Sequence, residues 1–219
     1  YEHTPLYHAW DAIAIDGEES WYRVLARQHP GFRYLTQGQR DKLALRHGLR
    51  FVWEHPWLTV KRDVVKFFNF WQLERAMVAG MVRGHWGTLP MAAVIPIAGV
   101  ILGGYAVAVI TAIFGATLGR PQDWRVHGLL LLVIALICGV HTLTFAHSRY
   151  HLPLMPILLL YSASAMVNYR AIWQRRRSRL FGLAVGLVVV LIGGWIWETA
   201  VADWSRIAAA LQSWSHPKF

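Results

Sequence analysis

Four long stretches without a charged residue constrain this chain more than any other feature. They cover residues 89–118, 126–146, 152–169 and 180–197. About 20 apolar residues in an α-helix cross a bilayer core of ~30 Å, so each stretch is long enough to span it. Only helices and closed barrels satisfy the backbone inside a bilayer, and these stretches lack the alternation of a barrel strand. The sequence therefore predicts an all-α integral membrane protein with about four transmembrane helices.

Composition agrees with this class and excludes several others. Of the 219 residues, 55% are hydrophobic and 16% are charged, which excludes a disordered chain and an ordinary water-soluble domain. The net charge is +10, and such a balance is typical of chains that bind nucleic acid or anionic lipid. Because the basic residues are distributed around the spans, we expect anionic lipid and no nucleic acid. With one cysteine, Cys138, the chain has no disulfide framework.

The charges between the spans predict an orientation. The connection after the first span carries Arg120 and Arg125, whereas the next connection carries only Arg149. The last connection carries Arg170, Arg175, Arg176, Arg177 and Arg179. Arginine-rich loops stay on the cytoplasmic side of a membrane. We therefore expect Arg149 and both chain ends on the non-cytoplasmic face, with the bacterial inner membrane as the setting.

The chain divides by composition into three parts. Residues 1–88 are expected to form an extramembrane or interfacial segment, and residues 89–213 the membrane domain. The last six residues, WSHPKF at positions 214–219, resemble a streptavidin-binding purification tag, and we give them no functional role. The first residue is Tyr1, which predicts a processed chain or a part of a longer one.

The segment before the first span contains two helical patterns. Residues 1–37 have no sustained period, and a first helical face then ends before His55-Pro56, where Pro56 suits the first position of a new helix. The first face consists of Leu45, Leu49, Val52 and Trp53. The second helix sets Val60, Val64, Phe67, Phe68 and Trp71 opposite Lys61, Arg62 and Lys66. Such a basic amphipathic helix either lies in the membrane interface or packs on the membrane domain.

The stretch HSRYHLPLMP, residues 147–156, is the most unusual local sequence. Arg149 lies at the mouth between two spans, where a charge is costly unless it has a partner or reaches water. Its guanidinium can grip a phosphate with two hydrogen bonds, and Tyr150 can donate another. His147 and His151 flank this pair. The four residues are candidate lipid-phosphate ligands, and the alternative is an interfacial loop that holds lipid phosphate without specificity.

The histidines are expected to have structural roles. His147 and His151 share a helical face only if the loop is helical, and Pro153 disfavours a continuous helix there. No carboxylate accompanies them as a further metal ligand. His127 and His141, within one apolar stretch, are expected to be satisfied interior histidines. We therefore expect no metal site and no cofactor.

Two segments resemble the C-terminal part of GT-C membrane glycosyltransferases that use polyprenyl-phosphate sugars, namely protein O-mannosyltransferases and lipid A aminoarabinose transferases. One segment is RYHLPLMPILLLYSA, which begins at Arg149. The other is QRDKLALRHGLRFVWEHPWLTVKRDVVKFFNFW, which ends at Trp71 and is similar to the family's helix, His/Asn-Pro and basic helix ending in Phe-Trp. Their order and their separation by two spans also match, over residues 39–170.

The resemblance implies sugar transfer from a lipid-phosphate carrier on the non-cytoplasmic side. It implies that Arg149 and Tyr150 neighbour the carrier phosphate. The basic residues that it places along the headgroup side are Lys61, Arg62 and Lys66. The family's catalytic acid follows its first span, and no carboxylate of this chain lies in that place. We therefore assign no catalytic residue, and the chain resembles the carrier-binding half of an enzyme whose chemistry belongs to the other half.

Two other functions are compatible with the sequence. One is a non-catalytic transmembrane subunit that packs within a larger membrane complex. The pairs Gly99/Gly103 and Gly182/Gly186 would allow the close helix approach that this function needs. The other is a transporter or flippase fragment for lipid-linked sugars. The preferred function needs Arg149 and the subunit function does not, and both predict an N-terminal half or another membrane subunit as partner.

Overall fold

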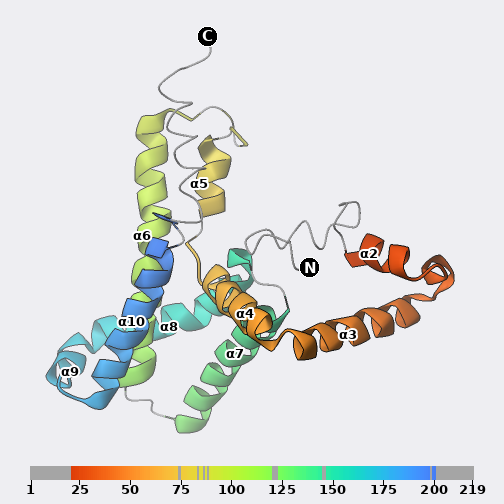
Figure 1. Cartoon of the computed structure of the whole chain (residues 1–219). Helices are drawn as coiled ribbons and strands as arrows, with labels where there is room; N and C mark the ends of the chain where they lie inside the picture. The colour runs from red at the N-terminus through yellow and green to blue at the C-terminus, as the bar shows by residue number, and fades with distance from the viewer. Residues whose placement is uncertain are drawn as a thin grey trace. The chain divides into compact units, whose positions relative to one another are not determined.

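The computed structural model describes residues 21–73, 75–82, 84–85, 87, 89–119, 123–144, 147–197 and 199–200. Residues 1–20 and the tag-like tail at 214–219 lie outside the described residues. The elements, labelled as in Figure 1, are α2 (Trp21–Gln28), η1 (Phe32–Tyr34), α3 (Gln37–Glu54), α4 (Pro56–Phe70), α5 (Arg75–Val82), α6 (Met91–Leu118), α7 (Trp124–Leu143), η2 (Ser148–Leu154), α8 (Met155–Val167), α9 (Tyr169–Gln174) and α10 (Arg179–Trp197). Four helical segments in this described part are long and apolar enough to cross a membrane, and no residue of it belongs to a β-strand. The predicted all-α membrane fold is confirmed.

The chain forms two compact units that divide inside α4. The first unit comprises residues 1–66 and the second comprises residues 67–219. Sequence analysis instead divides the chain at residue 88, where the composition changes. The last residues of α4 therefore belong to the unit that contains the four membrane-crossing segments.

The first unit begins, in its described part, with a helix that the sequence did not predict. α2 has eight residues, which make only about two turns. A helix this short does not produce a sustained apolar period in the sequence. α3 then starts after Thr36, whose backbone N–H donates to the Gln39 side chain at 2.9 Å. It ends at Glu54, and α4 starts at Pro56 as predicted, because proline lacks the N–H that continues a helix but fits a first turn.

The apolar faces of α3 and α4 differ in exposure. The predicted face of α3 is exposed throughout, and that helix buries no residue. Its members are Leu45, Leu49, Val52 and Trp53. On α4, Val60 and Val64 are about half exposed, whereas Val65 and Phe70 are buried. The first part of the predicted apolar face of α4 is therefore exposed, whereas Phe68 and Trp71 of the same predicted face are half-buried.

Three of the spans match their predicted ranges closely. α6, α7 and α10 begin and end within three residues of the uncharged stretches that predict them. The third span differs, because the stretch 152–169 is divided between η2 and α8. Pro153 lies inside η2 and Pro156 in the first turn of α8, so two backbone donors are missing where a continuous α-helix would need them. α9 follows in a connection that the sequence predicts as a loop, which is a correction.

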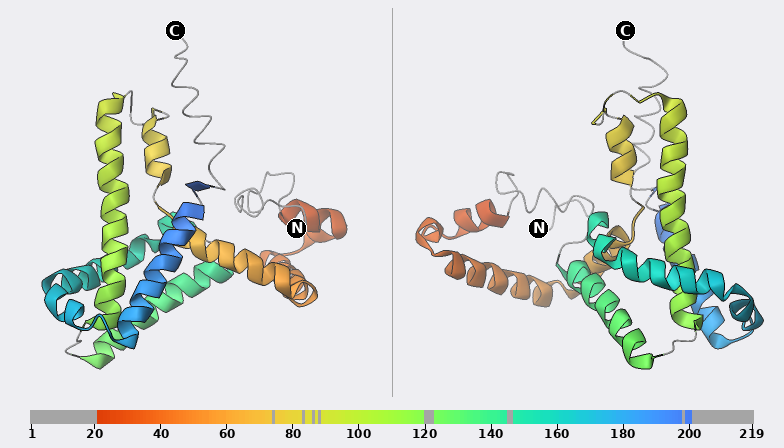
Figure 2. Two further views of the ribbon diagram at one scale, coloured as in Figure 1. Left: turned by 60° about the vertical axis from the view of Figure 1, so that its left-hand side comes forward. Right: turned by 180° about the vertical axis from the view of Figure 1, so that it is seen from behind.

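The second unit is organised around α6, which lies against α8 and α10 (Figures 1 and 2). A side chain at Gly115 of α6 would collide with the backbone carbonyl of Tyr161 in α8, so these helices meet at backbone distance. Gly194 of α10 similarly faces the ring of Phe68. The core consists of Phe70, Tyr105, Val109, Ala112, Leu154, Leu158, Tyr161, Leu191 and Trp195. The glycine pairs singled out in the sequence have no atom within 4 Å of an added Cβ and lie outside these contacts.

Candidate lipid-phosphate site

The C-terminal end of α4 is bound by side chains from three other elements. A helix leaves its last carbonyl groups without intrahelical partners. The carbonyl of Phe70 accepts a hydrogen bond from His151 of η2 at 2.8 Å. The next carbonyl, that of Trp71, accepts from Nε1 of Trp195 at 2.8 Å and from the Tyr105 hydroxyl at 3.3 Å. These bonds join η2, α6 and α10 at one point of the second unit.

His151 is the most enclosed polar residue of the site. Its side chain is completely buried. A carbonyl oxygen accepts only, so the bond to Phe70 places the proton on Nδ1. The imidazole also stacks on the ring of Tyr105, with centroids 4.7 Å apart. We therefore give His151 a positioning role, because a buried imidazole does not reach a lipid headgroup.

A second aromatic pair fixes the start of η2 against α7. Tyr150 stacks on His141, with centroids 4.3 Å apart and planes within 5°. His141 also stacks on Phe70 at 6.0 Å. Tyr150 is half-buried, and the His141 ring lies in contact with both Tyr150 of η2 and Phe70 at the end of α4. His141 and His127 both have partners, as predicted, since Nδ1 of His127 lies 2.9 Å from the Tyr161 hydroxyl, but both are only half-buried and not interior.

Arg149 projects from this fixed backbone. The His147 side chain caps η2, because its Nδ1 accepts the backbone N–H of Arg149 at 3.3 Å. Arg149 itself is exposed, while Tyr150 and His147 of the same motif are half-buried. The His147 cap and the ring stacks of Tyr150 and His151 therefore fix the backbone of η2 on both sides of Arg149.

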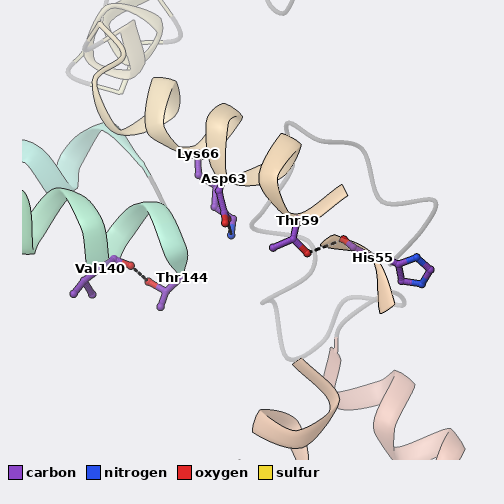
Figure 3. Close-up of polar contacts among 6 residues, drawn as sticks. All are labelled: His55, Thr59, Asp63, Lys66, Val140 and Thr144. Carbon is purple, nitrogen blue, oxygen red and sulfur yellow. Dashed lines mark hydrogen bonds and ion pairs between the residues drawn. The ribbon is translucent and has the colours of Figure 1, made fainter. Parts of the chain in front are cut away.

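The basic residues of α4 lie in the first unit and are described there. Lys66 forms an ion pair with Asp63 at 2.9 Å (Figure 3). The guanidinium of Arg62 lies 5.3 Å from the centroid of the Phe51 ring. Lys61 is exposed. The predicted lipid-phosphate ligands are thus divided between the units, with Arg149, Tyr150 and His151 on η2 and His147 at its cap.

The candidate site on η2 carries one arginine and no carboxylate. Asp123 is the one carboxylate among the described residues of the second unit, and it caps the start of α7 by accepting the backbone N–H of Arg125 at 2.7 Å. α7 is about 30 Å long, and η2 contacts it near the end opposite Asp123, where His141 stacks on Tyr150. Nowhere in the described ranges do three or more histidine, cysteine or acidic residues converge as metal ligands. The site therefore offers hydrogen-bond donors and a cation, and we assign no catalytic residue to it.

Sequence reasoning missed the residues that support the site. Tyr105 lies in the middle of an apolar stretch, and Trp195 lies near the end of another. A tyrosine hydroxyl within an apolar stretch needs a polar partner, and this signal was available. Its partner is the backbone carbonyl of Trp71. Every residue has a backbone carbonyl, so the sequence does not indicate which one accepts the bond.

The fold defines an all-α integral membrane protein, and the candidate site lies at the start of its third candidate span. Searches with this chain found no matching protein-family model, no matching curated protein and no matching solved structure. The resemblance to polyprenyl-phosphate-dependent glycosyltransferases therefore stays a prediction from two sequence segments, and a function has to be argued from the site.

Proposed function

We propose that this chain is the carrier-binding, C-terminal part of a membrane glycosyltransferase that transfers a sugar from a polyprenyl-phosphate donor. The observation that carries the proposal is the placement of Arg149. It is exposed on a short 3-10 helix at the entrance of a span, and that helix is fixed by the His151 bond to Phe70. Because the backbone of η2 is already fixed, only the Arg149 side chain has to lose conformational freedom when its guanidinium binds a phosphate with two hydrogen bonds.

The surroundings of Arg149 suit a lipid carrier better than a soluble phosphate. The helix that follows η2 exposes large apolar side chains, including Leu159 and Leu160, which are each more than half exposed. These surfaces favour contact with a long hydrocarbon chain. The phosphate then lies at the level of η2, where Tyr150 and His147 provide further polar atoms. The proposed ligand therefore has an apolar tail and an anionic head.

The orientation proposed for the chain follows from its arginines. The guanidinium of Arg175 donates to the carbonyl of Leu118 at 3.2 Å, so the last connection meets the end of α6. Both arginine-rich connections thus adjoin the same end of α6. The positive-inside rule assigns that end to the cytoplasm. η2 is then non-cytoplasmic, as are both chain ends, and the bacterial inner membrane is the proposed setting.

The basic residues of α4 and the exposed apolar face of α3 support contact of the first unit with lipid. α3 combines that face with Arg46 and Arg50 beside it, which is typical of a helix in the plane of a membrane interface. In the proposed function Lys61 and Arg62 contribute to the attraction of anionic headgroups. The electrostatic attraction from Lys61 and Arg62 is additive and long-range, whereas Arg149 contacts the carrier phosphate directly.

The test is sugar transfer by the complete protein with its native membrane partners. We expect Arg149→Ala to lower turnover from a polyprenyl-phosphate donor about tenfold or more, because a hydrogen-bonded charge contributes ~1.5–3 kcal/mol. Arg149→Lys keeps the charge but loses the planar fork, so we expect an intermediate rate. Arg125→Ala is the matched control, since it removes the same charge from another connection. Unchanged turnover in Arg149→Ala, with normal protein levels in the membrane, would contradict the proposal.

A non-catalytic subunit of a larger membrane complex is the second candidate. α7 buries none of its residues, and Gly99 of α6 has no atom within 4 Å of an added Cβ. Both surfaces remain available to another chain. In this function Gly99→Leu breaks assembly of the complex, while Arg149→Ala leaves the function of the complex unchanged. Co-purification of the two variants separates the candidates.

A further inference from the structure

A groove opens at the other end of α8 from η2. It has a volume of about 810 Å³ and lies among α6, α8, α9 and the start of α10. Its apolar lining includes Phe114 of α6, Met166 of α8, Trp173 of α9 and Phe181 of α10. The volume falls within the ~300–1,000 Å³ typical of small-molecule sites. Neither the sequence motifs nor the proposed function involves this groove.

The polar atoms of the groove are concentrated at α9. Arg170 lines the groove, and its Nε donates to the Tyr169 hydroxyl at 3.0 Å. A guanidinium has five N–H donors, so this bond uses one of them. The guanidinium of Arg176 lies 5.6 Å from the centroid of the Trp173 ring, beside the lining. An apolar groove is thus bordered by cations on one side.

The groove's own elements offer these arginines no carboxylate. No aspartate or glutamate occurs between positions 124 and 197, which include α8, α9 and α10. The same stretch has five arginines from Arg170 to Arg179. Arg175 is the one whose guanidinium donates to the end of α6, at the Leu118 carbonyl. The charge of this surface is therefore complementary to an anionic ligand.

We propose that the groove binds an anionic phospholipid of the surrounding membrane, with an acyl chain on the apolar lining and the phosphate on Arg170. Tyr169 and Trp173 are exposed aromatic residues of the kind enriched at headgroup level, so the groove lies at the depth that the ligand requires. Basic pockets between spans are the usual sites of such lipids. This site is separate from η2 and does not depend on the proposed glycosyltransferase function.

The experiment is native mass spectrometry of the purified protein with short-chain phosphatidylglycerol and, separately, phosphatidylcholine. We expect a saturable phosphatidylglycerol adduct and a weaker phosphatidylcholine adduct. Arg170→Gln should raise the phosphatidylglycerol Kd about fivefold, the change that corresponds to the ~1 kcal/mol typical of one basic residue near an anionic membrane. Arg125→Gln is the matched control, because it removes a charge from the other arginine connection, outside the lining.

A second variant tests the apolar part. Met166→Trp places a larger side chain on the exposed lining, and it should lower binding of both lipids while Arg170→Gln lowers binding of the anionic lipid alone. Equal binding of the two lipids, or equal losses in Arg170→Gln and Arg125→Gln, would overturn the proposal. Retention of a second protein chain in the groove, displaced by Met166→Trp, would overturn it in favour of a protein partner.

Discussion

The shared acceptor at Trp71 leads to a prediction about coupled side chains. Its carbonyl accepts from Trp195 at 2.8 Å and from Tyr105 at 3.3 Å. Tyr105→Phe removes the longer bond and keeps the ring that stacks on His151. Trp195→Phe removes the shorter bond and reduces the buried volume. Each single variant leaves the carbonyl with one of the two donors, whereas the double variant removes both.

The expected magnitudes follow from these geometries. A hydrogen bond between helices in a membrane contributes ~0.6 kcal/mol on average and ~1.7 kcal/mol at most. We expect Tyr105→Phe to lower the free energy of unfolding by about 0.5 kcal/mol, because its bond is long. Trp195→Phe should cost about 1–3 kcal/mol, since a packing loss adds to the bond. The double variant should exceed the sum by roughly 1 kcal/mol, because a half-buried carbonyl without a donor incurs part of the ~1–3 kcal/mol desolvation cost of an unpaired polar group.

The assay is unfolding of the purified protein in mixed micelles by titration with sodium dodecyl sulfate, followed by circular dichroism. The four proteins of the cycle are compared under the same conditions. Losses that add within about 0.3 kcal/mol would refute the shared-acceptor argument, since residues without a common partner behave additively.

Two further predictions concern packing and orientation. Gly115→Leu should lower the thermal unfolding temperature and the yield of monodisperse protein, because the added side chain meets the backbone of α8. Gly99→Leu, where an added Cβ meets no atom, should leave the unfolding temperature of the purified chain unchanged or raise it. Equal behaviour of the two variants would contradict the α6–α8 contact. In a Cys138→Ala background, a membrane-impermeant maleimide should label Thr144→Cys in intact cells and Arg177→Cys only after permeabilisation, and the reverse pattern would contradict the proposed orientation. Thr144 is exposed at the end of α7, where its hydroxyl donates to the Val140 carbonyl at 2.7 Å (Figure 3).

The spans were predictable because exclusion of charge from a bilayer is a strong and local rule. The break at His55-Pro56 was predictable for a similar reason, since proline constrains its own residue and the one before it. The division of the third span between η2 and α8 was only half predicted: Pro153 argued against a continuous helix, but not for the 3-10 turn that formed. Short helices such as α2 and α9 carry too few residues for a period to stand out.

The support of the site could not be predicted because it depends on long-range contacts. His151 and Phe70 are 81 positions apart, and Trp195 and Trp71 are 124 apart. Nothing local distinguishes His151, which is completely buried, from His147, which is half-buried at the cap of η2. The sequence proposes residues 147–156 as the candidate site, and only the packing distinguishes the buried His151 from the exposed Arg149.

Photo-crosslinking tests the central claim most directly. The purified protein is irradiated with a polyprenyl phosphate that carries a diazirine in its first isoprene unit, and the labelled peptides are mapped by mass spectrometry. The account predicts labelling of η2 and the start of α8 that unlabelled polyprenyl phosphate displaces, that Arg149→Gln abolishes and that Arg125→Gln preserves. Labelling that is indifferent to Arg149→Gln, or that falls in the groove beside Arg170 instead, would contradict it.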